Sequence, residues 1–210
     1  MKRFLALTLC VIMALCFTAC GENGSTANPN KNGNTDYSKG THHAVIDVKN
    51  YGKIELELDA DTAPITVENF CTLAENGFYD GLTFHRIVDE FVIQGGDPDH
   101  NGMGGSDKEI KGEFAENGVR NDISHKRGVI SMARANDPNS ASCQFFIVHE
   151  DIYKGTPNSL ILDGKYAGFG YVTKGMEVVD RIVEGTPVED ENGTVLFENQ
   201  PVINSIKVID

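Results

Sequence analysis

The sequence contains no tryptophan and little positive charge. Its 210 residues include 18 Lys and Arg against 31 Asp and Glu, which gives a net charge of −13 at pH 7. Nucleic-acid binding relies on Lys and Arg to neutralise phosphates, so this balance argues against a nucleic-acid partner and favours an acidic, well-solvated surface. With 40% hydrophobic residues, the chain suits one globular domain plus a tail.

The first 20 residues are predicted to be a targeting segment rather than part of the fold. Lys2 and Arg3 are charged, residues 4–17 are apolar, and small residues precede Cys20. This pattern resembles a bacterial lipobox, although Phe17 stands where Leu is usual. It predicts that Cys20 carries lipid such as palmitate, and that the mature protein is an extracytoplasmic lipoprotein anchored to the cell membrane. An uncleaved membrane anchor and ordinary secretory cleavage nearby are the alternatives.

Few cysteines remain after such processing. Beyond Cys20, the mature chain keeps only Cys71 and Cys143. Two cysteines can pair in an oxidising compartment. Cys71 is expected on a helical face and Cys143 at the start of a strand, and these positions favour separate buried thiols.

A polar segment, residues 21–41, follows the targeting segment. It is rich in Asn, Gly, Ser, Thr and Lys and is predicted to be a flexible tether. At about 5–6 Å × √n its reach is about 25 Å. The folded domain is predicted to span residues 42–210, beginning at His42-His43. This histidine pair has no Cys or carboxylate at ligand spacing and favours polar surface over a metal site.

The domain is predicted to be mainly β. Alternating residues on both sides of Asn50-Tyr51-Gly52 indicate a hairpin. A helix is predicted to open at Asp61-Thr62-Ala63-Pro64, with a capping residue and a proline in the first turn, and to end at Gly77. About eight short strands with two helices argue for a β-barrel or sandwich. Beyond the hairpin, the expected strands are 82–87, 92–95, 128–132, 144–148, one within 160–172 and 202–209, with the second helix at 175–183.

Residues 84–97, Phe-His-Arg-Ile-Val-Asp-Glu-Phe-Val-Ile-Gln-Gly-Gly-Asp, say most about function. Side chains alternate between the two faces of a strand. Regular alternation therefore places Phe84 and Arg86 on one face of their strand, and Val92 and Gln94 on one face of theirs. His85 falls on the face opposite Arg86, which favours a buried, hydrogen-bonded histidine over a catalytic one.

A second run, residues 144–148, repeats this arrangement, with Gln144 and Phe146 on one face and Phe145 on the other. The two runs together offer a cation, two amides and aromatic rings to one surface, without a nucleophile–base pair, metal cluster or phosphate loop. Such a site suits a reaction that breaks no bond, such as rotation about an X–Pro bond, whose barrier is roughly 18–20 kcal/mol. A hydrolase is disfavoured because Ser131 lacks a G-x-S-x-G elbow.

These motifs resemble the cyclophilins, the cyclosporin-binding peptidyl-prolyl isomerases. Residues 84–97 resemble the family signature, and the resemblance extends over roughly residues 42–210. It implies a closed eight-stranded antiparallel β-barrel capped by two α-helices, isomerase activity without a cofactor or metal, and proline-containing segments of unfolded or partly folded proteins as partners. Further blocks resemble the family at Ser131-Met132-Ala133, Gln144-Phe145-Phe146, Leu162-Asp163-Gly164-Lys165 and Phe169-Gly170.

The resemblance also assigns roles to residues. Arg86 would stabilise the twisted imide, with Gln94 and Phe91 as its catalytic neighbours. Ala133 and Arg134 match the stretch whose backbone pairs with the residue before proline, although Asn is common at Arg134 in eukaryotic members. The remaining residues implied in substrate binding are Val92, Gln144, Phe146, Leu162 and Tyr166.

Two positions depart from many eukaryotic cyclophilins. Ile161 stands where these carry a Trp that binds cyclosporin, and Tyr166 stands where they carry a His. Isomerase activity is expected to survive both changes, whereas cyclosporin is expected to bind weakly. A non-catalytic proline-binding chaperone or scaffold with the same fold is the alternative function.

Overall fold

The computed structural model describes residues 35–210. Its first two strands form the hairpin that the sequence predicts. Strand β1 (Thr41–Val48) pairs antiparallel with β2 (Gly52–Asp59), and Ile46 lies opposite Ile54. Asn50 takes a positive φ of 67° at the turn, a conformation that Asn tolerates better than most residues. Alternate side chains of both strands are fully buried, so one face of the hairpin joins the core.

Eight strands form one antiparallel sheet, in the order β10-β1-β2-β9-β5-β6-β4-β3. This confirms the predicted mainly-β fold, the strand number and the strand direction. The strands beyond the hairpin are β3 (Phe84–Val88), β4 (Val92–Gly95), β5 (Val129–Met132), β6 (Phe145–Val148), β9 (Ala167–Lys174) and β10 (Ile203–Val208).

The sheet curves into a half-barrel, so the prediction of a fully closed barrel is an overstatement. No ladder joins β3 to β10 among the described residues. The two end strands meet only just before each begins, through an isolated bridge between Thr83 and Val202 and backbone hydrogen bonds such as Phe84 N–H to Pro201 O (3.0 Å).

Helix α1 (Pro64–Glu75) confirms the first predicted helix, with Val67, Phe70 and Ala74 buried on one stripe. The predicted local cap is wrong, because the N-cap residue is Ala63 and no side chain near it in sequence caps the helix. The first free amides are satisfied instead by the carboxylate of Glu113, which accepts from the N–H groups of Ile65 (3.0 Å) and Thr66 (2.8 Å). A distant loop therefore fixes this helix end.

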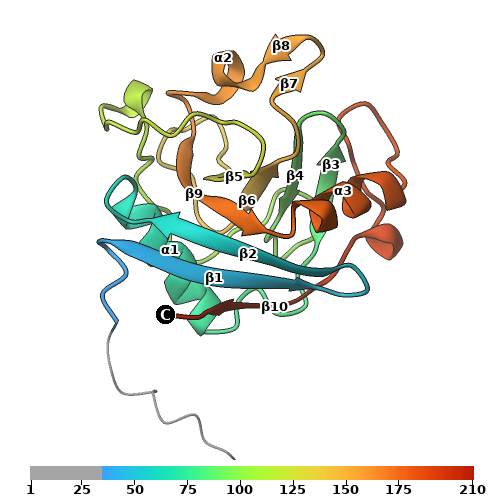
Figure 1. Ribbon diagram of the computed structural model, residues 1–210, viewed down its shortest axis with the longest axis horizontal. Coiled ribbons are helices and arrows are strands. Elements are labelled where there is room, and N and C mark those ends of the chain that lie inside the picture. The colour runs from blue at the N-terminus through green and yellow to red at the C-terminus, as the bar shows by residue number, and fades with distance from the viewer. Residues whose placement is uncertain (1–34) are drawn as a thin grey trace, which may run out of the picture. The chain divides into compact units, whose positions relative to one another are not determined.

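The second predicted helix is α3 (Met176–Gly185), which buries Val178, Val179 and Ile182. The chain between β6 and β9 holds structure that the sequence did not indicate. A separate two-stranded sheet of β7 (Ile152–Tyr153) and β8 (Thr156–Pro157) precedes a short third helix, α2 (Asn158–Leu162), and Figure 1 shows the three together at the top of the view. Two 3₁₀ turns, η1 (Ala115–Asn117) and η2 (Phe197–Asn199), complete the described elements.

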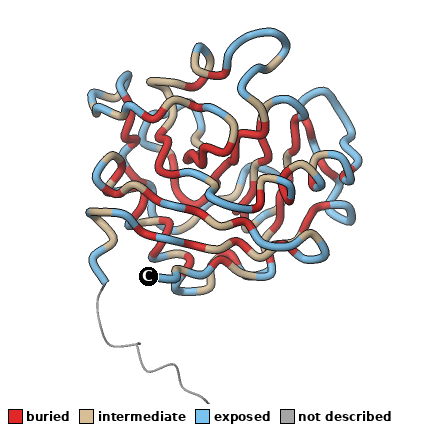
Figure 2. Tube along the Cα trace, in the orientation of Figure 1, coloured by how far each residue is buried: buried red, intermediate tan, exposed pale blue. Residues whose placement is uncertain are grey.

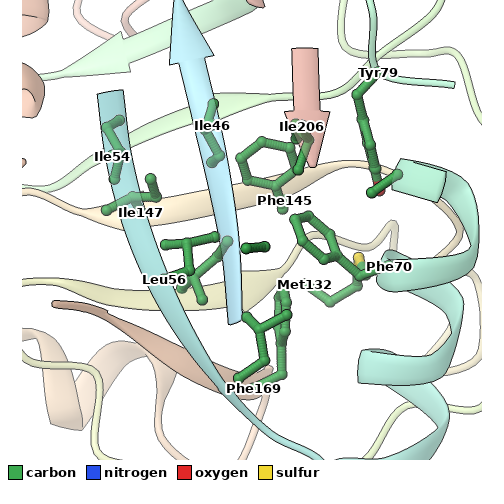
Figure 3. Close-up of a cluster of buried hydrophobic side chains, with 14 of the residues drawn as sticks. Ile46, Ile54, Leu56, Phe70, Tyr79, Met132, Phe145, Ile147, Phe169 and Ile206 are labelled. Carbon is green, nitrogen blue, oxygen red and sulfur yellow. The ribbon is translucent and has the colours of Figure 1, made fainter. Parts of the chain in front are cut away.

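The main core lies between the curved sheet and α1 (Figures 2 and 3). Phe70 of α1 packs against Phe145 at a centroid distance of 5.6 Å and against Phe169 at 5.3 Å. The hydroxyl of the fully buried Tyr79 donates to the Cys143 carbonyl at 3.0 Å. A second, smaller buried cluster lies on the other side of β4 and β6 and underlies the site described below.

The compact unit begins at Thr35, so residues 35–41 of the predicted tether belong to it. Tyr37 packs against the core and meets the His42 ring edge-on at 5.1 Å, which anchors this stretch. The targeting segment, Cys20 and residues 21–34 lie outside the described residues. Across residues 35–210, no helix is long and apolar enough to cross a membrane. Cys71 and Cys143 are separate buried thiols, as predicted.

Candidate active site

Strand pairing brings the predicted polar residues together. Arg86 on β3 lies directly opposite Gln94 on β4, and Gln94 lies opposite Phe146 on β6. One prediction about this region is wrong, because Phe84 and Arg86 do not share a face. The β3–β4 register shifts between these two residues, and this bulge sends Phe84 into the main core while Arg86 reaches the opposite side.

One cavity of about 370 Å³ gathers the predicted site. It contains every residue that the resemblance implied except Gln144, and it adds Ile161 and Lys165. Gln144 lines an adjoining hollow together with Gly102, Gly104 and Gly105 of a Gly-rich loop. The lining residues of the cavity are Arg86, Phe91, Val92, Gln94, Ala133, Arg134, Phe146, Ile161, Leu162, Lys165 and Tyr166.

The floor of the cavity is apolar. Val92, Phe146 and Leu162 are buried and pack in the second cluster, with Phe91 and Tyr166 partly buried against them. Phe146 meets the Tyr166 ring edge-on at a centroid distance of 5.8 Å. A small saturated ring that enters here exchanges water for aromatic and aliphatic surface, which favours its binding.

A chain of side-chain hydrogen bonds forms the polar wall. Arg86 Nη1 donates to Gln94 Oε1 (3.3 Å), Gln94 Nε2 donates to Gln144 Oε1 (2.9 Å), and Gln144 Nε2 donates to the Gly104 carbonyl (2.8 Å). Each amide both accepts and donates, so the chain has one direction from the guanidinium to the Gly-rich loop. The wall therefore holds Arg86 in a fixed position beside the apolar floor.

A second contact secures Arg86 from behind. Its Nε donates to the Asn192 carbonyl at 2.8 Å, a partner that lies 106 residues away in sequence. Burial lowers the pKa of Arg86, while the nearby Tyr153, Tyr166 and Asp190 act in the opposite direction. An arginine remains protonated despite pKa shifts of this kind, so Arg86 keeps its hydrogen-bond donors.

Tyr153 is a site neighbour that the sequence analysis missed. Its ring stacks on Phe91 at a centroid distance of 4.6 Å and an interplanar angle of 24°. It comes from β7, a two-residue strand without a periodic pattern. Asn192 was missed for a similar reason, because it contributes only a backbone carbonyl, which residue type does not reveal.

Ser131, His125 and Asp163 form a hydrogen-bonded chain behind the floor. His125 Nε2 lies 2.8 Å from Ser131 Oγ, and its Nδ1 lies 2.8 Å from Asp163 Oδ1. Ser131 is fully buried, and the His125 ring stacks against Phe146 at 6.0 Å, so no substrate carbonyl can reach the hydroxyl. Burial lowers the pKa of His125 against the opposing effect of Asp163. The chain supports the floor and does not provide a hydrolase triad.

His85 is buried, as predicted, but the expected hydrogen bond is missing. Neither ring nitrogen has a hydrogen-bond partner among the described residues. The bulge places the ring beside Gly102 rather than in the cavity. Burial lowers the pKa of His85 to about 4, so the ring is neutral at pH 7.

Other features of the described residues do not converge on this site. A hollow of about 460 Å³ lies between α1 and residues 98–108, with Leu73, Phe78 and Lys108 in its walls, and holds none of the predicted site residues. No group of three or more His, Cys, Asp or Glu side chains within residues 35–210 is placed to hold a metal ion.

Comparison with known proteins places the chain in a family. The family model described as cyclophilin type peptidyl-prolyl cis-trans isomerase/CLD matches residues 43–208. The chain belongs to this family. Among curated relatives, this cyclophilin is 44% identical over 142 residues to a peptidyl-prolyl cis-trans isomerase of Helicobacter pylori, covering 67% of this chain and 80% of that one. It is 40% identical over 172 residues to peptidyl-prolyl cis-trans isomerase A of Dickeya dadantii, covering 75% and 80%.

Solved structures support the same family. A cyclophilin-type isomerase of Cryptosporidium parvum superposes with a TM-score of 0.67 at 29% identity, covering 81% of this chain and 99% of that one. A second crystal structure of that isomerase was obtained in the presence of the dipeptide Ala-Pro and gives a TM-score of 0.66 at 29% identity over 80% and 99%. The present chain is therefore a cyclophilin-type peptidyl-prolyl cis-trans isomerase, and the scaffold-only alternative is not needed.

Proposed function

We propose that this isomerase binds the proline ring of its substrate on the Val92–Phe146–Leu162 floor and accelerates X–Pro rotation with the Arg86 guanidinium. The observation that supports this most strongly is that one cavity holds both an apolar floor and an anchored guanidinium. The Ala-Pro dipeptide used with the Cryptosporidium relative supports proline-containing segments as the substrate class.

The chemistry follows from the electronic structure of the imide. The C–N bond resists rotation because the nitrogen lone pair is delocalised into the carbonyl. Twisting the bond localises that pair on the prolyl nitrogen. A donor beside the nitrogen therefore stabilises the twisted form more than either planar isomer, and this differential binding lowers the barrier. Arg86 meets this need because its bonds to Gln94 and Asn192 hold the guanidinium in place, so that its remaining N–H donors are positioned in advance.

The test measures cis/trans exchange of a short proline peptide by NMR, with wild-type protein and with the Phe146→Ala variant. The wild type should bring exchange from tens of seconds into the subsecond range. Phe146→Ala should weaken peptide binding, because it removes the aromatic ring from the Val92–Phe146–Leu162 floor. Unaccelerated exchange with folded wild-type protein would overturn the proposed site, and unchanged binding by Phe146→Ala would place the proline ring elsewhere.

For location we propose a lipoprotein held at the outer face of a bacterial cell membrane through lipidated Cys20, acting on extracytoplasmic proteins. The support is the order of the charged, apolar and small residues before Cys20 in the sequence. Labelled palmitate should enter the wild-type protein and not the Cys20→Ala variant. Equal labelling of the wild type and the variant would contradict the anchor. Labelling of neither, together with secretion of the protein, would contradict it as well.

A further inference from the structure

The cavity is positively charged although the protein is acidic. Its walls include Arg86, Arg134 and Lys165, and no Asp or Glu within residues 35–210 lines it. The whole chain carries a net charge of −13. Within residues 35–210, none of these three cations forms an ion pair with a carboxylate, whereas others such as Arg127 and Lys174 do. Cations left unpaired at a substrate cavity of an acidic protein indicate an anionic group on the substrate.

Arg134 is held firmly without a counter-ion. Its guanidinium lies between two rings, 4.8 Å from the Tyr166 centroid and 5.1 Å from the Phe114 centroid. Its Nε donates to the Lys165 carbonyl (2.9 Å) and its Nη1 to the Ala135 carbonyl (2.8 Å). Aromatic faces and carbonyls orient the group and leave its full charge uncompensated.

Lys165 joins Arg134 on the same side of the cavity. Both are half-buried, and the hydrogen bond from the Arg134 side chain to the Lys165 carbonyl ties the two positions together. Arg86 differs, because burial lowers its pKa while the charge of Asp190 acts in the opposite direction. Arg134 also lines the adjoining hollow, where Glu109 is the one acidic residue among those that the structure describes. The uncompensated charge is therefore concentrated at Arg134 and Lys165.

We propose that Arg134 and Lys165 make this isomerase prefer substrates with an acidic side chain one or two residues before the proline. The position follows from the resemblance, which places the residue before proline along Ala133 and Arg134. The inference rests on the proposed function, since it takes the proline ring to occupy the Phe146 floor. It adds a substrate class to that function: Asp- or Glu-bearing X–Pro segments.

The test compares peptides that differ only by Glu or Gln at each of those two positions, with kcat/KM measured by NMR exchange at low salt. The Glu peptide should be favoured by about five-fold, as expected for two partly exposed charge pairs. The preference should fall towards one in 1 M salt, where the screening length is about 3 Å. The readout is the Glu/Gln ratio, because absolute rates also report on folding and general binding.

Three variants locate the preference. Lys165→Gln and Arg134→Gln should each lower the Glu/Gln ratio by about two-fold, even where the rate on the Gln peptide also changes. Lys53→Gln removes an exposed charge that lines neither the cavity nor the adjoining hollow and should leave the ratio unchanged. A wild-type ratio near one, or a ratio that survives in both cavity variants, overturns this inference. Failure to isomerise even the Gln peptide would instead contradict the proposed function.

Discussion

At the residue scale, the position of Arg86 depends on a local irregularity. Regular alternation along β3 would place it beside Phe84, whose ring packs in the main core. The bulge between these residues separates them and lets Arg86 face Gln94 across the cavity wall. A bulge re-aims a side chain in this way because one extra residue opposes its partner strand.

Ile161 gives the first prediction at this scale. It lines the cavity at the position where a Trp binds cyclosporin in many eukaryotic cyclophilins. We expect weak inhibition of the wild type by cyclosporin. Ile161→Trp should tighten inhibition by roughly ten-fold, because it adds aromatic area and one N–H donor.

A proline-peptide exchange assay with increasing cyclosporin checks this expectation, and Ile161→Phe serves as a matched variant that adds area without the donor. Nanomolar inhibition of the wild type would show that the missing Trp does not limit affinity.

Residue type and spacing predicted most of the side chains that line the cavity, but not the residues that contribute through the backbone or from distant loops. Gln94 and Phe146 were predictable because strand alternation and the family motif agree on them, whereas Arg86 was predictable from the motif alone, because alternation places it with Phe84. Asn192 contributes only its carbonyl, and Tyr153 lies on a two-residue strand that offers too few positions to show a pattern. The bulge was unpredictable because alternation assumes a regular ladder.

At the scale of the element, the start of α1 depends on a residue that is distant in sequence, which local sequence rules do not capture. Asp61 and Pro64 suggested a self-contained helix start, yet the capping carboxylate comes from Glu113, which is only 2% exposed. Glu113 also accepts from the Thr66 hydroxyl at 2.7 Å. One side chain therefore satisfies three donors, two of which, the N–H and hydroxyl of Thr66, would otherwise be buried without partners.

We predict that Glu113→Ala lowers the free energy of unfolding by about 2 kcal/mol, the upper range for losing a helix cap. Urea unfolding monitored by circular dichroism measures the change. Glu116→Ala, at an exposed position in η1, is the matched control and should change stability little. Equal stability of the two variants would show that the Glu113 contacts contribute nothing net.

At the scale of the whole molecule, buried histidines link stability to pH. Burial lowers the pKa of His85 from its ordinary value of 6.5 to about 4 and lowers that of His125 as well. The unfolded chain therefore takes up a proton at a pH where the folded chain does not. The resulting stability is fully present above about pH 6.5 and falls as the pH decreases towards the folded pKa.

The expected loss from His85 alone is on the order of 2 kcal/mol between pH 7.5 and pH 5. Urea unfolding at pH 7.5, 6 and 5 measures it. His85→Gln removes the titrating group and should flatten this part of the profile. An identical pH dependence in that variant would mean that other groups cause the acid sensitivity.

The central claim is that Arg86 acts on the twisted imide and not on binding alone. One NMR titration of the Arg86→Ala variant with a proline peptide measures it, since chemical shifts give the affinity and exchange broadening gives the catalysed rate. We predict affinity within a few-fold of wild type and a loss of catalysed exchange on the order of 10²-fold or more, as for removal of one preorganised donor. Exchange at the wild-type rate in the folded variant would contradict the account.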